Sequence, residues 1–149
     1  MTFDWKSYLE LSSDLEKQAT NSDDNREAKL RSSVSRAYYS AFHEARKLLC
    51  REIANFESND YYRNHQAIIY QYESANEKTR KALGADLTKL RMIRNKSDYD
   101  NPYPYVIADD AEDAVLTAHE IIKVLDTLTP QPRLIKMLPP RKPRKKRKH

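Results

Sequence analysis

The stretch from Arg31 to Cys50 constrains the fold more than any other part of the chain. Its apolar residues recur at steps of three and four, the spacing that places one apolar stripe along an α-helix. Small side chains on the stripe alternate with aromatic ones, so neighbouring helices can approach closely while the rings fill the gaps. We therefore predict a central core helix from about residue 24 to residue 54. The stripe consists of Val34, Ala37, Tyr38, Ala41, Phe42, Ala45, Leu48 and Leu49.

The near absence of glycine extends this prediction to the rest of the chain. Gly84 is the one glycine among 149 residues, where an average composition would supply about ten. Because β-hairpins and tight strand connections depend on glycine, we expect an all-α fold. The expected architecture is an up-and-down bundle of four or five helices.

Four further segments carry apolar residues at helical spacing. The polar segment at 74–85 has room for a helical turn or two, and Gly84 is its expected flexible point. The core helix is expected to be capped by Ser22, Asp23 or Asp24. The first two predicted helices cover residues 3–19 and 64–73. The third runs from about Asp86 to the segment NPYPY at 101–105. The last is capped by Asp109 and Asp110 and ends at Pro130.

The chain is expected to divide into three parts. These are an N-terminal helix at 1–22 that packs on the bundle, a helical domain at 23–129, and a proline-containing polybasic tail at 130–149. Residues 141–149 carry seven positive charges and no negative one, so the remaining chain has a net charge of −2 when these seven are subtracted from the total of +5. Such a tail cannot bury apolar surface and is expected to be disordered. A short apolar patch at 134–138 is expected to dock on the domain or on a partner.

The positive charges of the tail attract any polyanion, and each one that neutralises a phosphate adds a salt-dependent contribution to binding. RNA or DNA is the partner that this composition favours. A solubility tail and a membrane-surface or localisation role are the alternatives. The nucleic-acid-binding candidates in the tail are Arg141, Lys142, Arg144, Lys145, Lys146, Arg147 and Lys148.

The residues present exclude several classes of function. A single glycine cannot form a glycine-rich phosphate loop. The four histidines are scattered and Cys50 has no companion cysteine, so neither a metal site nor a cofactor is expected. A lone cysteine suits a reducing compartment, and the chain has no apolar run long enough to cross a membrane. We therefore predict a cytoplasmic protein without a membrane partner.

A line of leucines along the helix predicted near residue 86 continues, at the same spacing, into charged residues. A buried arginine whose charge is unpaired is costly, so these charged residues are expected to share a hydrogen-bonded network. An ion pair between Arg94 and Asp98, four residues apart on one helix, is the purely structural alternative. The leucines are Leu83, Leu87 and Leu90, and the network would contain Arg91, Arg94, Asn95 and Asp98.

A second set of side chains lies off the apolar stripe of the core helix and has no packing reason to be there. These residues belong either to the surface or to a site. The set consists of Arg36, Tyr39, Ser40, His43 and Lys47.

Two segments together resemble the HEPN superfamily of small helical-bundle proteins. The first is SRAYYSAFHEAR (Ser35 to Arg46) and the second is LRMIRNKSDYDN (Leu90 to Asn101). They are similar to the branch with an RAYYxxFH helix and an RNKxDY segment, and the resemblance covers about Asp24 to Leu128. It implies a bundle of four or five helices that forms a homodimer, with the polar segments of both subunits at a cleft in the interface.

The resemblance also implies a chemistry: catalytic HEPN proteins are metal-independent RNases that use an arginine, the polar residue beside it and a histidine four to six residues further on. Arg94 and Asn95 match the first two positions, but Tyr99 stands where the histidine would be. A tyrosine with an ordinary pKa near 10 is a poor base at neutral pH, although it can donate a hydrogen bond or act as an acid. His43 would substitute if the core helix lies beside Arg94, and a structural role is the alternative for His43.

Two functions are therefore open, and His65 and His119 are interpreted as ordinary residues in both. The absent histidine favours a non-catalytic or weakly active HEPN-domain protein. It would dimerise and bind RNA or nucleotide, within a toxin-antitoxin or phage-defence system and beside a partner such as a nucleotidyltransferase. The alternative is a metal-independent endoribonuclease toxin that uses Arg94, Asn95 and Tyr99 or His43. The nucleic-acid-binding candidates in the domain are Arg36, Tyr39, Arg91 and Arg94.

Overall fold

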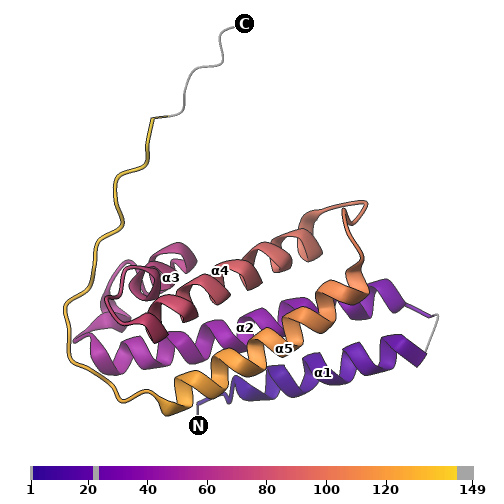
Figure 1. Cartoon of the computed structure of the whole chain (residues 1–149), viewed down its shortest axis with the longest axis horizontal. Coiled ribbons are helices and arrows are strands. Elements are labelled where there is room, and N and C mark those ends of the chain that lie inside the picture. The colour runs from indigo at the N-terminus through magenta and orange to yellow at the C-terminus, as the bar shows by residue number, and fades with distance from the viewer. Residues whose placement is uncertain (1, 22–23, 144–149) are drawn as a thin grey trace, which may run out of the picture.

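The computed structural model of the chain describes residues 2–21 and 24–143. These residues form five α-helices and one short 3₁₀ helix, and the described part of the chain contains no strand. Figure 1 shows the four long helices side by side, with successive long helices running in opposite directions and the short α3 at one end of the bundle. The all-α bundle predicted from the sequence is confirmed. The elements are α1 (Lys6–Asn21), α2 (Arg26–Glu52), η1 (Phe56–Ser58), α3 (His65–Glu73), α4 (Lys78–Tyr99) and α5 (Ile107–Thr127).

The central helix of the bundle is α2, which contacts α1, α4 and α5. Its predicted apolar stripe is buried throughout, and the three alanines of the stripe are completely inaccessible to solvent. Because alanine has no side chain beyond Cβ, the neighbouring helices can approach the α2 backbone, while Tyr38 and Phe42 fill the space between them. Cys50 is partly buried against the same core.

The start of α4 differs from the prediction. The helix begins at Lys78, eight residues before the predicted start, so the expected irregular segment is largely helical. The prediction of a flexible point at Gly84 is wrong, because Gly84 is buried inside α4 against α3. A Cβ atom at this position would lie 2.5 Å from the backbone nitrogen of Glu73, so glycine is needed for the close approach of two helices. The polar residues that suggested a loop face solvent on the first turns of α4, except for the buried Arg80.

The N-cap of α2 also differs from the prediction. The cap is Asn25, which lies in the left-handed region at φ 54° and makes no side-chain capping hydrogen bond. Asparagine adopts this conformation more readily than most residues. Asp24 is therefore not the cap, and the other two predicted candidates, Ser22 and Asp23, lie outside the described residues.

The last helix, α5, begins at Ile107, so Asp109 and Asp110 lie in its first turn and not at its cap. Carboxylates in this turn interact favourably with the positive end of the helix. Asp110 also accepts a hydrogen bond from the Tyr103 hydroxyl. This contact fastens the predicted NPYPY segment to α5.

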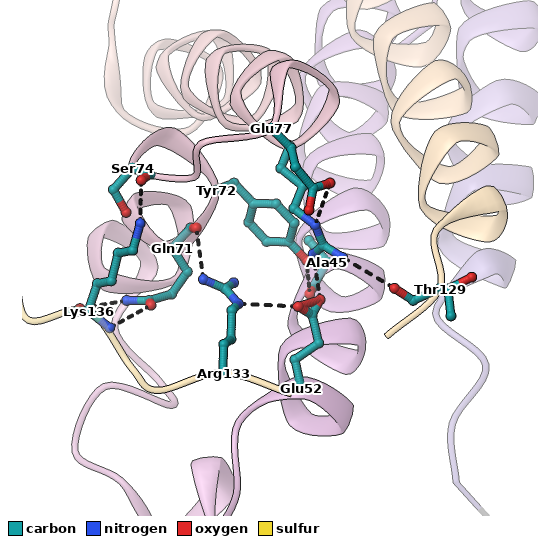
Figure 2. Close-up of polar contacts among 10 residues, drawn as sticks. Ala45, Glu52, Gln71, Tyr72, Ser74, Glu77, Thr129, Arg133 and Lys136 are labelled. Atoms are coloured by element: carbon teal, nitrogen blue, oxygen red, sulfur yellow. Dashed lines mark hydrogen bonds and ion pairs between the residues drawn. The ribbon is translucent and has the colours of Figure 1, made fainter. Parts of the chain in front are cut away.

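After α5 the described chain forms no further helix and returns along the ends of α2 and α3 (Figure 2). We call residues 133–136 the C-terminal strap. The backbone N–H of Arg133 donates to the carbonyl of Glu52 over 2.9 Å. The completely buried Gln71 side chain donates to the carbonyl of Lys136 (2.7 Å) and accepts from its N–H (2.9 Å). The strap is thus attached to the bundle through its own backbone.

A buried ion cluster lies beneath the strap, centred on the Glu52 carboxylate (Figure 2). Glu52 Oε1 accepts from Arg80 Nη1 at 2.5 Å, and Oε2 accepts from Arg133 Nε at 3.2 Å. The Arg80 guanidinium also approaches Glu77 and the carbonyl of Thr129, each at 3.4 Å. The side chains of Glu52 and Arg80 are 0% and 4% exposed. Because buried charges of opposite sign are tolerated only when each is paired, the cluster ties α2, α4 and the strap together.

The apolar patch predicted at 134–138 contacts the domain through Ile135, which packs against the core. Leu134 and Met137 remain exposed. Arg141 and Lys142 follow as exposed residues, and the remaining cations of the predicted tail, with its predicted disorder, lie outside the described residues. None of the helices in the described ranges is both long and apolar enough to span a bilayer.

Candidate functional site

Arg94 projects from α4 toward α2 and packs on two tyrosines. Its side chain is only 9% exposed, and its guanidinium carbon lies 5.1 Å from the ring centroid of Tyr38 and 5.3 Å from that of Tyr39. One carboxylate is nearby: Arg94 Nη1 is 3.3 Å from Asp98 Oδ2, one turn further along α4. The predicted ion pair between Arg94 and Asp98 is therefore present, and it lies at the edge of a buried aromatic surface.

The four-residue network predicted on α4 is not formed. The side chains of Arg91 and Asn95 make no hydrogen bond with any described residue, and the Nε atoms of both Arg91 and Arg94 are buried without a hydrogen-bond partner in the described structure. Arg94 and Asp98 are the two members that pair, although at 100° per residue all four side chains lie on one side of α4. Two buried guanidinium N–H groups are left without an acceptor.

His65, the first residue of α3, completes the site. Its Nδ1 lies 2.6 Å from the Tyr38 hydroxyl, and its ring stacks on Phe42 with centroids 4.1 Å apart. Burial, followed by the positive charges of Arg91 and Arg94, lowers the pKa of His65 to about 4. Burial also raises the pKa of Tyr38 well above its usual range, although the same two arginines oppose the shift. Both groups are therefore neutral at pH 7.

We refer to Tyr38, Tyr39, His65, Arg91 and Arg94 as the arginine–tyrosine site. His65, interpreted from the sequence as an ordinary residue, lies in contact with Tyr38 in the structure. No local pattern distinguishes it, because its place is set by the packing of α3 against α2 and α4. The Asn64 side chain, which accepts from the backbone N–H of Ala67, starts α3 at this point.

His43 lies next to the arginine–tyrosine site but does not contact Arg94. Its ring stacks on Trp5, with centroids 3.4 Å apart, and its centroid is 6.0 Å from that of Tyr39. Arg46 Nη2 donates to His43 Nδ1 over 2.7 Å, so the neutral ring carries its proton on Nε2. Burial and the charge of Arg46 lower the pKa of His43 to about 4. These contacts match the structural role that was the alternative for this residue.

Tyr99, at the motif position of the missing histidine, lies at the exposed end of α4. It is 77% exposed, and its side chain makes no hydrogen bond or ring contact with any described residue. At 100° per residue, a position five residues after Arg94 lies about 140° away around the helix. The residue that reaches Arg94 is Asp98.

The remaining domain candidates lie outside the arginine–tyrosine site. Arg36 lies over the ring of Tyr8, 4.8 Å from its centroid, and has no carboxylate partner in the described chain. Lys47 is paired with Glu44 at 3.1 Å. Of the predicted tail cations, Arg141 and Lys142 are exposed, and Arg144, Lys145, Lys146, Arg147 and Lys148 lie outside the described residues.

The arrangement can bind an anion more readily than it can transfer a proton. It offers the guanidinium groups of Arg91 and Arg94, each with an unpaired Nε, beside Tyr38, Tyr39 and a neutral histidine, and guanidinium groups match phosphate oxygens well. The described residues include no group of three or more His, Cys, Asp or Glu side chains arranged to hold a metal ion.

Comparisons with known proteins identify the family. No curated protein and no solved structure matches the chain. A family model of the HEPN domain matches residues 12–128, a range that contains all of α2, α3, α4 and α5. The chain therefore belongs to the HEPN domain family.

Proposed function

We propose that this HEPN-domain protein binds RNA or a nucleotide through phosphate contacts at the arginine–tyrosine site, and that it is non-catalytic or only weakly active as a nuclease. It acts as a homodimer in a toxin-antitoxin or phage-defence system, beside a partner such as a nucleotidyltransferase. The observation that carries the proposal is the pair of buried Nε atoms of Arg91 and Arg94 without acceptors.

Unpaired N–H groups on a charged side chain are costly to bury, since each loses its water without gaining a protein acceptor. The rings of Tyr38 and Tyr39 offset part of this cost by cation–π attraction, and Asp98 offsets another part. A phosphate at the site would satisfy the remaining donors with charge-assisted hydrogen bonds. The same contacts would make binding strongly dependent on salt.

Weak or absent cleavage follows from the protonation states at the site. Metal-free cleavage of RNA needs one group to remove the 2′-hydroxyl proton and another to protonate the leaving oxygen. The pKa of His65 and that of His43 are about 4, so neither ring is in the imidazolium form that could act as a general acid at pH 7. The pKa of Tyr38 is raised, which excludes the phenolate as a base.

One observation favours the alternative, a metal-independent endoribonuclease. His65 lies within the electrostatic reach of Arg91 and Arg94, so a histidine is present beside the arginine although the sequence motif lacks one. A bound phosphate would add negative charge and raise the pKa of His65 toward a useful value. In this alternative Arg94 stabilises the charge on phosphorus, and His65 takes the part assigned from the sequence to Tyr99 or His43.

The proposed dimer is supported by apolar side chains that α4, α5 and the segment between them leave exposed. Such residues on two adjacent elements are typical of an interaction surface. Light scattering coupled to gel filtration would measure the mass in solution, and a monomer at working concentration would contradict this part of the proposal. The exposed residues are Met92, Tyr99, Tyr105, Val106 and Leu116.

RNA binding and cleavage are tested together with Arg94→Gln, which removes the charge, and with Arg26→Gln, a matched change at the exposed start of α2. Fluorescence anisotropy with single-stranded RNA measures binding, and gels in EDTA measure cleavage. We expect Arg94→Gln to weaken binding at least tenfold, Arg26→Gln to change it little, and no protein to cut. Cleavage in EDTA that is lost in Arg94→Gln would establish the alternative. An unmodified protein that neither binds nor cuts RNA would contradict both.

A further inference from the structure

A pocket of about 260 Å³ opens between α3 and α4, directly beside the arginine–tyrosine site. Ile69 and Met92 form its apolar walls, and the amide side chains of Gln66 and Asn95 line it. We infer that this pocket holds one base of a bound single-stranded RNA and prefers a base that carries an exocyclic amino group. This inference rests on the proposed function, because it assumes that the phosphate of the same RNA lies at the arginines.

The charge of the pocket favours a base over a phosphate. Arg91 and Glu73 are the ionisable residues that line it, so their charges cancel, and a phosphate would be repelled by the carboxylate. Gln66 and Asn95 are exposed, and their side chains make no hydrogen bond with any described residue. A neutral planar ligand with donors and acceptors on its edge is what such amides recognise, and unstacked RNA bases present these edges.

The Glu73 carboxylate supplies the preference for an amino group. The Thr88 hydroxyl donates to its Oε1, and no described residue donates to its Oε2. An ionised carboxylate accepts hydrogen bonds and donates none. The exocyclic amino groups of adenine and cytosine are donors, whereas hypoxanthine and uracil present a carbonyl oxygen at the corresponding position. Adenine and cytosine therefore satisfy Glu73, and their oxo counterparts place an acceptor against it.

Two adjacent pairs of residues connect the pocket to the arginine–tyrosine site. Gln66 follows His65 on α3, and Asn95 follows Arg94 on α4, so on each helix one residue faces the site and the next lines the pocket. Arg91 belongs to both, because it lines the pocket and lowers the pKa of His65. A nucleotide can therefore place its phosphate at the arginines and its base in the pocket.

The experiment compares short single-stranded RNAs that differ by one amino group: adenosine against inosine, and cytidine against uridine, at a single position in an otherwise constant sequence. Binding is measured by fluorescence anisotropy with the unmodified protein, with Glu73→Gln and Gln66→Ala, and with Glu112→Gln as a matched change on α5. We expect the amino-bearing RNA to bind about tenfold more tightly. Glu73→Gln should reduce the ratio of the two affinities, amino-bearing RNA over its oxo counterpart, several-fold. Glu112→Gln should leave that ratio unchanged.

The outcomes separate this inference from the proposed function. RNA that binds in an Arg94-dependent manner but equally well with adenosine and inosine would overturn the inference and leave the proposed function standing. A ratio of affinities for amino-bearing and oxo RNA that stays the same in both Glu73→Gln and Gln66→Ala would also overturn the inference, because the preference for the amino group would then arise outside the pocket. An unmodified protein that binds none of the RNAs would overturn both. Circular dichroism and unfolding midpoints equal to those of the unmodified protein would exclude misfolding of the variants.

Discussion

Two buried arginines on the same helix, Arg80 and Arg94, have different surroundings. Arg80, near the start of α4, meets the fully buried Glu52 carboxylate at 2.5 Å, and a second carboxylate and a carbonyl lie at 3.4 Å. Arg94, four turns later, has one carboxylate at 3.3 Å on its own helix, rests on two aromatic rings and keeps a buried Nε without an acceptor. In the Glu52 cluster the strap residue Arg133 leaves only its Nη2 unpaired in the described structure. This difference supports the proposal that Arg80 serves the fold and that Arg94 binds a ligand.

The largest effect is expected at the Glu52 cluster. Glu52→Ala would leave the charges of Arg80 and Arg133 without their carboxylate, so the free energy of unfolding should fall by about 3–5 kcal/mol. Asp98→Ala, which removes the carboxylate of Arg94 at a more exposed position, should lower it by about 1 kcal/mol. Urea denaturation measures both values. Equal losses would show that the two arginines are not distinguished by their pairing.

The close approach of α3 and α4, one turn after Arg80, is tested by Gly84→Ala. Alanine gains up to about 1 kcal/mol in helix propensity, but its Cβ would lie 2.5 Å from the Glu73 nitrogen. Forcing the helices apart costs about 1–3 kcal/mol, so we expect a net loss in the free energy of unfolding. Ala82→Gly, at an exposed position of the same helix, gives the propensity difference alone. If Gly84→Ala raised the free energy of unfolding by the full propensity difference, the close contact between Gly84 and Glu73 would be contradicted.

Acid should destabilise the region of Arg94 before that of Arg80, because the two half-buried histidines lie there. His43 and His65 have pKa values of about 4 in the folded protein, against about 6.5 when unfolded. Between these values the unfolded chain binds more protons at the two histidines, so their contribution to stability is lost as pH falls from 6.5 to 4 and is constant above that range. Each half-exposed ring should contribute about 1 kcal/mol, because solvent screens it. His65→Gln should reduce the dependence of the free energy of unfolding on pH, measured by denaturation at several pH values. His119→Gln, a change at an exposed position of α5, should leave this dependence unaltered.

The smallest change in stability is expected for Arg94→Met. Replacing an incompletely paired buried charge by an apolar side chain of similar length is often neutral or stabilising, so the free energy of unfolding should change by less than about 1 kcal/mol while RNA binding is lost. Arg80→Met is the matched change, and it should destabilise strongly because it leaves Glu52 with one partner. If Arg94→Met lowered the free energy of unfolding as much as Arg80→Met, both arginines would have a structural role.

Much of the fold is predictable because local periodicity encodes it. The apolar stripe of α2 is visible in the spacing of Val34 to Leu49, and burial follows that spacing closely. The start of α4 is not predictable in this way, because its first turns are polar and face solvent. The role of Gly84 depends on Glu73 of another helix, which no local pattern contains.

The candidate site is predictable only in part. The inward direction of Arg94 follows from the leucines that precede it, and its pairing with Asp98 follows from helical spacing. The position of Tyr99 in the motif predicts that it belongs to the site, but the turn of the helix places it on another side of α4 from Arg94. His65 belongs to the site because it contacts Tyr38, 27 residues earlier in the chain. The composition of the C-terminal segment does not predict the ion pair between Arg133 and Glu52, which lie 81 residues apart.

The backbone pairing between Gln71 and Lys136 has a practical consequence for shortened versions of the protein. The family match ends at residue 128, which suggests a natural place to stop the chain. A protein ending there would expose the Gln71 amide and one oxygen of Glu52 to a newly opened surface. Truncations intended for crystallisation or for fusion to a reporter should therefore end after residue 138 and retain the eight residues beyond Pro130.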